Sequence, residues 1–155
     1  MTHLARTCLA AFVLLSITSC DHGSAPKDKA TAVSAAEASD LLINRNWMDL
    51  WPESETEKLN VFRFVPSMGG GVFQDRTLFK GTFELFTFNV KGDVIAFNLH
   101  HSKEKVEAKF RIERVLGPKP FDLRLTIDSS PRGPSQYFGR SSETATDLGL
   151  HPLTK

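Results

Sequence analysis

The feature that most constrains the fold is an alternation of apolar and polar residues in two consecutive segments, 105–115 and 120–128, which is strict over 105–113 and 121–128. The apolar positions are Val106, Ala108, Phe110 and Ile112 in the first segment, and Phe121, Leu123, Leu125 and Ile127 in the second. Successive side chains of a β-strand point to opposite faces, so each segment predicts a strand with one buried and one solvated face. Gly117, Pro118 and Pro120 indicate a turn between them.

Segments of this kind recur from residue 46 to residue 140, with short links between them. The candidate strands are 46–51, 59–65, 72–79, 82–90, 94–100, 105–115, 120–128 and 136–140. No link after residue 46 has room for a crossover helix, which excludes a parallel βαβ architecture. We therefore predict an all-β fold class: an antiparallel up-and-down meander that forms a barrel of about eight strands, because closure removes exposed sheet edges.

Local signals refine this outline. Ser34 and Glu37 have capping-box spacing and predict a short helix over 35–43 that covers one end or face of the barrel. Gly92 predicts a tight turn between two strands. The glycine triplet 69–71 predicts a hairpin loop, and a strand pattern follows it where a phosphate cradle would need a helix.

The N-terminus has the features of a secretory signal peptide, which we assign to residues 1–19. Arg6 precedes an apolar run from Cys8 to Ile17, and small residues follow. This run is about half of the roughly 20 apolar residues that a membrane-spanning helix needs. We therefore expect the segment to be removed rather than to span a membrane.

The four residues Ile17, Thr18, Ser19 and Cys20 resemble the lipobox of bacterial lipoproteins. The resemblance implies lipidation of Cys20 through a thioether to diacylglycerol, cleavage just before it, and acylation of the new N-terminus, for example by palmitate. The protein would then be a membrane-anchored lipoprotein of the cell envelope. Asp21 after the cysteine implies inner-membrane retention by the rule of enteric bacteria, and the choice between inner and outer membrane stays open.

Several consequences follow for the mature chain. Its only cysteine would be acylated, so it would contain no disulfide, zinc-thiolate site or cysteine nucleophile. Of the 19 basic residues Arg6 is lost, which leaves 18 against 18 acidic residues, and this balance argues against nucleic-acid binding. We divide it into a lipidated cysteine with a flexible tether (20–33), a barrel domain (34–140) and a polar C-terminal tail (141–155).

The predicted domain also resembles the lipocalin-like small β-barrels of bacterial envelope lipoproteins. The resemblance rests on Asn46 and Trp47 after a short helix, on the meander of hairpins, and on residues 137–140 at its end. It implies that Trp47 sits at the base of the barrel with Arg140 packed across its ring. Arg45 stands where the family has a glycine two positions before the tryptophan.

The expected inner face is rich in phenylalanine. The candidates are Phe62, Phe64, Phe83, Phe86, Phe88, Phe97, Phe110 and Phe121, of which Phe62, Phe64, Phe86, Phe88, Phe97 and Phe110 are our ligand-binding candidates. An eight-stranded barrel is wide enough either for one small apolar ligand or for side chains that fill it. Both alternatives stay open at this stage, with the filled barrel favoured.

Other polar residues predict little chemistry. His100 and His101 are consecutive and would face opposite sides of a strand, and Glu53, Glu55 and Glu57 lack the spacing of a calcium loop, so we predict no metal site. Asp75, Arg76, Ser129, Ser130 and His151 are the residues to test for catalysis, but none lies in a catalytic motif. We predict a protein that is not an enzyme and needs no cofactor.

Two functional hypotheses remain. In the first, the lipid-anchored barrel binds a small apolar molecule or nothing inside. In the second, it is a protein-interaction or inhibitor module that docks an envelope partner through its outer face or through loops 53–57 and 66–71.

Overall fold

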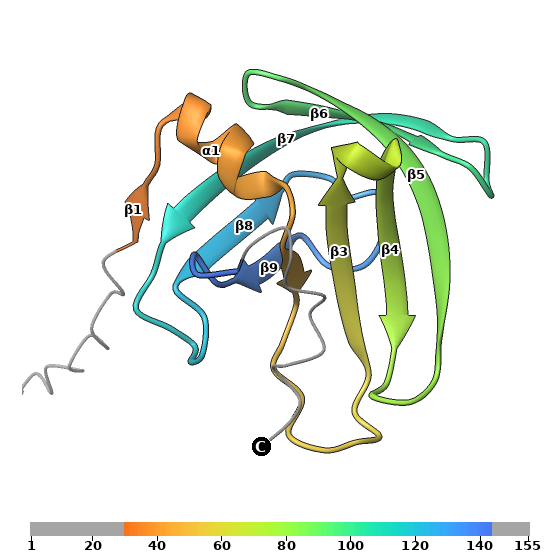
Figure 1. The fold of residues 1–155 in the computed structure, drawn as a ribbon, viewed down its shortest axis with the longest axis vertical. Helices are drawn as coiled ribbons and strands as arrows, with labels where there is room; N and C mark the ends of the chain where they lie inside the picture. The colour runs from red at the N-terminus through yellow and green to blue at the C-terminus, as the bar shows by residue number, and fades with distance from the viewer. Residues whose placement is uncertain (1–29, 144–155) are drawn as a thin grey trace, which may run out of the picture.

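The structure, a computed structural model, describes residues 30–143 and shows a closed antiparallel β-barrel (Figure 1). Its elements are β1 (Thr31–Ala32), α1 (Ala35–Leu42), β2 (Asn46–Met48), β3 (Leu59–Val65), the 3₁₀ turn η1 (Pro66–Met68), β4 (Gly70–Arg76), β5 (Gly81–Lys91), β6 (Val94–Leu99), β7 (Lys105–Arg114), β8 (Leu123–Ile127) and β9 (Gln136–Gly139). The predicted signal peptide, Cys20, most of the tether, and residues 144–155 of the tail lie outside the described residues.

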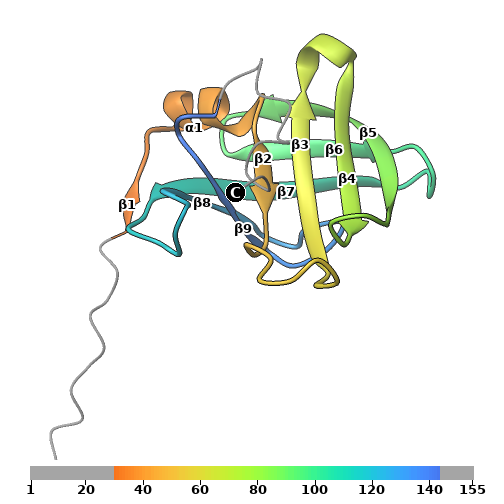
Figure 2. The same ribbon diagram turned by 60° about the horizontal axis from the view of Figure 1, so that its bottom comes forward.

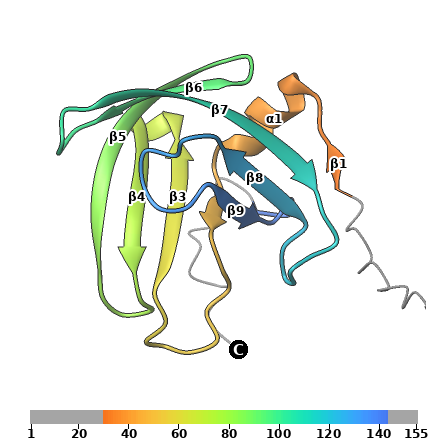
Figure 3. The same cartoon turned by 180° about the vertical axis from the view of Figure 1, so that it is seen from behind.

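The strands pair in the order of the sequence. Within residues 30–143, β2 to β9 each pair antiparallel with the next strand, and the Met48–Phe138 pair joins β9 back to β2. β8 and β9 complete the wall beside β7 (Figure 3). This topology confirms the predicted up-and-down barrel of eight strands. β1, from the end of the predicted tether, adds to the edge of β7 through Thr31 and Ala32.

The helix closes one end of the barrel. Ser34 Oγ accepts a hydrogen bond from the Glu37 backbone N–H at 3.2 Å, as the capping box predicts. The Glu37 carboxylate pairs with Arg114 at 2.6 Å and so ties the helix to β7. Leu42 is fully buried, and its carbonyl accepts a hydrogen bond from Trp47 Nε1 at 2.9 Å. Among residues 30–143, the structure contains no helix with the length and hydropathy needed to cross a membrane.

The two predicted glycine turns are present. Gly92 has a φ of +63° in the β5–β6 hairpin, and Gly69 has a φ of +79° after η1 in the β3–β4 hairpin. Gly70 and Gly71, which we expected in the loop, already pair with β3, so β4 begins two residues earlier than predicted. In Figure 2, η1 joins the ends of β3 and β4 on the near side of the barrel.

Aromatic rings from several strands meet inside the barrel. The ring centroid of Phe62 lies 4.8 Å from Phe73, 5.2 Å from Tyr137 and 5.7 Å from Phe86. Phe62, Phe64, Phe86, Phe97 and Phe110 are buried, and Phe88 packs against the same cluster. The inward placement of these six side chains agrees with the sequence pattern.

Two of the expected inward side chains lie elsewhere. Phe83 is 72% exposed, so the prediction for it is wrong: β5 points Phe86 and Phe88 inward, and a residue three positions before Phe86 must face outward. Phe121 precedes β8 and is buried in a second cluster with Met48 and Val61, on the outer side of the barrel. The wall is therefore covered by apolar side chains on both faces near β2 and β3.

Candidate binding surface on the outer barrel face

Five of the six ligand-binding candidates make ring contacts with one another inside the barrel, and Phe110 is buried in the same cluster. Phe64 lies 5.5 Å from Phe86, 5.1 Å from Phe88 and 6.1 Å from Phe97, measured between ring centroids. Centroid separations of 4.5–7 Å are those of directly packed aromatic pairs. These rings occupy the space that a ligand in their midst would need, which favours the filled barrel. Ligand binding at these residues stays a prediction.

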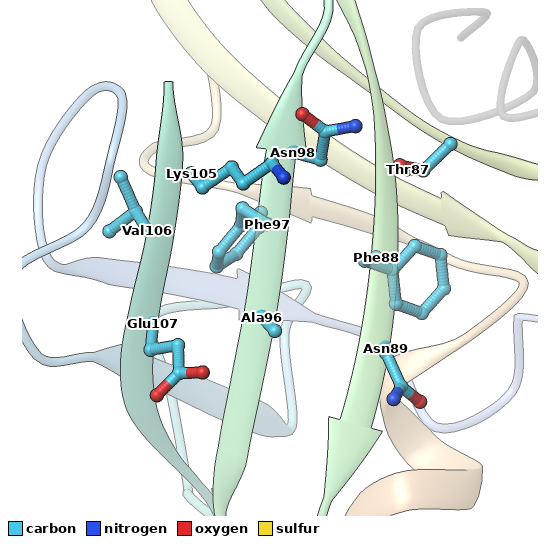
Figure 4. A pocket seen from close by; sticks show the side chains of 9 residues that line it. All are labelled: Thr87, Phe88, Asn89, Ala96, Phe97, Asn98, Lys105, Val106 and Glu107. Carbon is cyan, nitrogen blue, oxygen red and sulfur yellow. The ribbon is translucent and has the colours of Figure 1, made fainter. Parts of the chain in front are cut away.

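A hollow of about 500 Å³ lies over residues 87–89 of β5, 96–98 of β6 and 105–107 of β7 (Figure 4). The register pairs Thr87 with Asn98 and Asn89 with Ala96, so these side chains share one face of the wall. Figure 4 shows Asn89 and Glu107 on different strands without a common point of convergence. Thr87, Asn98 and Lys105 form a second cross-strand row at the other end of the hollow, so its polar side chains are spread along the wall.

A more apolar groove of about 340 Å³ lies on the outer face of β4 and β5 beside η1, and we call it the β4–β5 groove. It is lined by Val65, residues 68–72, residues 85–87 and His100. The register places Val72 beside Leu85, and Met68 at its end is 84% exposed. At Gly71 a Cβ atom would lie 2.5 Å from the Phe86 ring and 2.6 Å from the Arg63 carbonyl oxygen. The glycines thus let the β4 backbone approach its neighbours closely and leave one wall of the groove without side chains.

The apolar surface extends beyond the groove. Phe79 and Phe83 are exposed and line an adjoining hollow of about 210 Å³ that also contacts Val72. We call the set Met68, Val72, Phe79, Phe83 and Leu85 the outer apolar surface. Large contiguous apolar patches on soluble proteins often mark a binding site.

A polar cluster lies next to this surface, on β2 and β3. Glu143 Oε1 accepts hydrogen bonds from the Asn46 backbone N–H at 2.9 Å and from Asn46 Nδ2 at 2.7 Å, and lies 3.5 Å from Arg63 Nη1. The Glu143 residue is only 5% exposed. The Ser141 N–H also donates to Asp122 Oδ1 at 2.7 Å. These contacts fix residues 141–143, the first part of the predicted tail, to the barrel.

Arg45, directly before β2, completes the cluster. Its Nη1 donates to the Arg140 carbonyl at 2.7 Å, and its buried Nε finds no acceptor among the described residues. Burial lowers the pKa of Arg45, and the nearby Glu143 and Asp122 carboxylates oppose this effect. Arg45 therefore ties the end of β9 to the start of β2.

Trp47 is fully buried, and its Nε1 donates a hydrogen bond to the Leu42 carbonyl at the end of α1. A Cβ atom on Gly139 would lie 3.0 Å from Trp47 Cζ3, so the β9 backbone packs directly on the indole ring. The contact of the Arg140 side chain with the Trp47 ring stays a prediction.

A charged network joins the β6–β7 and β8–β9 links to strand β5. Arg132 pairs with Glu84 at 2.7 Å and with Glu104 at 2.9 Å, and the Ser102 hydroxyl donates to Glu104 at 2.7 Å. The pKa of Arg132 is raised, chiefly by its hydrogen bond to Glu84. The pKa of Glu104 is lowered, first by Ser102 and then by Arg132. Because the charged groups of this network are paired with one another, the network holds the β6–β7 and β8–β9 links in place.

Four of the other residues that we singled out have structural partners. Arg76 donates to the carbonyls of Thr77 and Leu78, and Ser130 donates to the carbonyl of Arg132. Glu57 accepts from the Glu53 N–H within its own loop.

His100 lines the β4–β5 groove. Within residues 30–143, no three histidine, cysteine, aspartate or glutamate side chains are grouped to hold a metal ion. His151 lies outside the described residues.

The fold and surface define a class: a closed eight-stranded antiparallel β-barrel, consistent with a lipocalin-like fold, that has an aromatic interior and an apolar outer surface. Comparison of the chain with protein-family models, with curated proteins and with solved structures finds no match.

Proposed function

We propose that this protein is a non-enzymatic, lipid-anchored component of the cell envelope that docks an extended apolar segment of another envelope protein on its outer apolar surface. The observation that carries the proposal is the β4–β5 groove with the exposed side chains of Met68, Phe83 and Leu85 around it. The groove volume of about 340 Å³ falls at the low end of the range for ligand pockets, roughly 300–1,000 Å³. A short segment with one or two apolar side chains fits this size.

The barrel architecture supports a docking role for the outer face. The interior rings pack on one another, whereas Phe83 and Leu85 point away from them. Because closure pairs every strand from β2 to β9 on both sides, we expect the partner to bind through side chains rather than by adding a strand to those pairs.

The anchor is the second part of the proposal. The lipobox-like residues 17–20 support acylation at Cys20, and each buried methylene of an acyl chain contributes about 0.8 kcal/mol to membrane binding. Confinement to one membrane raises the effective concentration of the barrel toward partners on the same surface. A docking surface of moderate size is then sufficient for binding.

Site-specific photocrosslinking tests the docking role. A photoreactive residue replaces Phe83 in the full chain, and another replaces Leu116, which is also exposed but lies in the β7–β8 link. We expect one defined envelope protein to be captured at position 83 and not at 116.

The purified partner should bind the full chain, and Leu85→Glu should weaken that binding at least tenfold without lowering the thermal midpoint, where tenfold corresponds to about 1.4 kcal/mol. Equal binding by Leu85→Glu would contradict the proposal.

The first of our two hypotheses, an apolar ligand inside the barrel, is the second candidate. The ring of inward phenylalanines is the observation that favours it. Native mass spectrometry of the purified chain distinguishes the candidates: a stoichiometric lipid-like molecule that is lost on Phe62→Trp would support the interior site. A bare chain mass would support the outer surface.

A further inference from the structure

The described chain ends next to the β4–β5 groove. The register aligns Asn46 with Arg63, Arg63 with Val72, and Val72 with Leu85, so these four residues form one row across β2 to β5. Trp47 and Phe62 point inward, and therefore this row faces outward. Glu143 contacts Asn46 and Arg63 at one end of the row, and Val72 and Leu85 line the groove at the other end.

The distance from this exit point to the groove is short. Neighbouring strands lie about 4.8 Å apart, so Val72 is one strand and Leu85 two strands from Arg63, or roughly 5 and 10 Å. Residues 144–155 follow Glu143. Twelve residues can extend to about 40 Å, at roughly 3.3–3.6 Å each, several times what is needed.

The composition of this segment matches an apolar surface. Leu148, Leu150 and Leu153 are its large side chains, and its one acidic and one basic side chain, Asp147 and Lys155, balance. Leu148 and Leu150 would point to the same side in an extended segment. The groove is apolar, so aliphatic side chains without excess charge suit it.

We propose that residues 144–155 occupy the β4–β5 groove of their own chain, with the leucine side chains against Val72, Leu85 and Met68. Glu143 is the fixed point from which the segment crosses β3. A partner that uses the groove must displace this segment, which makes the C-terminal segment a built-in competitor. The inference rests on the proposed function in that both treat the groove as a binding site.

The position of the N-terminus argues against a lipid surface as the occupant. β1, where the tether enters the described structure, and the β4–β5 wall lie on opposite sides of the barrel in Figures 1, 2 and 3. The groove therefore lies on the side of the barrel farther from the point where the tether enters it. The C-terminal segment, in contrast, starts within two strands of the groove.

Photocrosslinking within the full chain tests the inference. A photoreactive residue replaces Met68 at the groove, and in a control it replaces Leu116 in the β7–β8 link. Trypsin cleaves after Arg140, so the segment is released as one peptide, 141–155. We expect this peptide to be joined to peptide 64–76 at a yield that does not depend on protein concentration, and no such product from position 116. A product that forms only between two chains, or none from position 68, would overturn the inference.

A second measurement covers the case in which the photoreactive residue itself displaces the segment. We replace Leu148, Leu150 and Leu153 together by serine, which should release the segment from the groove. If the segment covers the groove of the wild type for at least half of the time, this variant should bind the apolar dye bis-ANS at least about twofold more tightly than the wild type does. Adding Leu85→Glu should abolish the gain. Unchanged dye affinity in the triple variant would contradict the inference.

These results separate the two proposals. If peptide 141–155 is joined to the groove but no envelope partner is captured, the docking function fails and the inference stands. If a partner binds equally well to the wild type and the triple serine variant, only the competitor role fails.

Discussion

Tyr137 is the single tyrosine of the chain and reports on the barrel interior. Its ring packs on Phe62, and its hydroxyl donates to the Arg132 carbonyl at 2.9 Å. Burial raises the pKa of Tyr137 well above its ordinary value, and the nearby Asp49 carboxylate adds to this effect. The native state therefore holds the phenol proton more tightly than the unfolded chain does.

An alkaline titration should show this directly. A raised folded pKa contributes stability that is fully present below the unfolded pKa of about 10 and is lost as the pH rises toward the folded pKa. We expect the phenolate absorbance at 295 nm to increase only together with loss of near-ultraviolet circular dichroism. Ionisation near pH 10 in a chain that keeps its native dichroism would show that Tyr137 is exposed.

Glu143 lies beyond the predicted domain boundary and yet is buried. Glu143→Ala removes the acceptor for the Asn46 N–H and the partner of Arg63, and a buried polar group left without a partner costs about 1–3 kcal/mol. We expect a loss of this size in urea unfolding, and a smaller one for Glu143→Gln, which keeps a carbonyl oxygen. The exposed Glu107 is the control, because Glu107→Ala should change stability by less than about 0.5 kcal/mol. If the wild type and Glu143→Ala unfold at the same urea concentration, the contacts of Glu143 with Asn46 and Arg63 do not stabilise the barrel.

Among the elements, the strands could be predicted because alternation is a local property of the sequence. β5 differs from the other strands because it has large apolar residues on both of its faces. Phe83 and Leu85 point to one face of the strand, and Phe86 and Phe88 point to the other. A strand without a bulge can bury only one of these two faces in the barrel interior. If Phe86 and Phe88 face the interior, the alternation of side chains places Phe83 and Leu85 on the outside of the barrel. The sequence pattern of β5 therefore indicates the outer apolar surface.

The hairpin between β3 and β4 depends on the lack of a side chain at Gly71. A Cβ atom there would overlap both the Phe86 ring and the Arg63 carbonyl. We expect Gly71→Ala to lower the free energy of unfolding by about 1–3 kcal/mol, as overpacking does. Gly117→Ala is the matched control, since its Cβ atom would meet nothing closer than the Lys119 nitrogen at 3.6 Å. If both variants unfold at the same denaturant concentration, the close approach at Gly71 is not required.

At the scale of the whole molecule, the closure of the barrel could be predicted but its contents could not. Phe62 meets rings from β4, β5, β6 and β9, and no local pattern tells whether such rings touch or surround a ligand. The Asn46–Glu143 bond likewise joins residues 97 positions apart. Contacts between residues so far apart in the sequence form only in the complete fold. The β4–β5 groove and the polar cluster around Glu143 could therefore not be predicted from local sequence patterns.

The proposed lipid anchor concerns the whole protein, and the two cysteines of the chain supply a matched pair of variants that test it. If Cys20 is the acylated residue, Cys20→Ser should abolish labelling by a clickable palmitate analogue, whereas Cys8→Ser in the predicted signal peptide should keep it. The intact mass of the labelled wild type should correspond to a chain that begins at Cys20. The core of the described barrel is built from residues after position 30, so the thermal midpoint of Cys20→Ser should equal that of the wild type. If the label persists in Cys20→Ser, the lipid is attached to another residue. If the label disappears in Cys8→Ser, acylation at Cys20 alone does not explain the labelling.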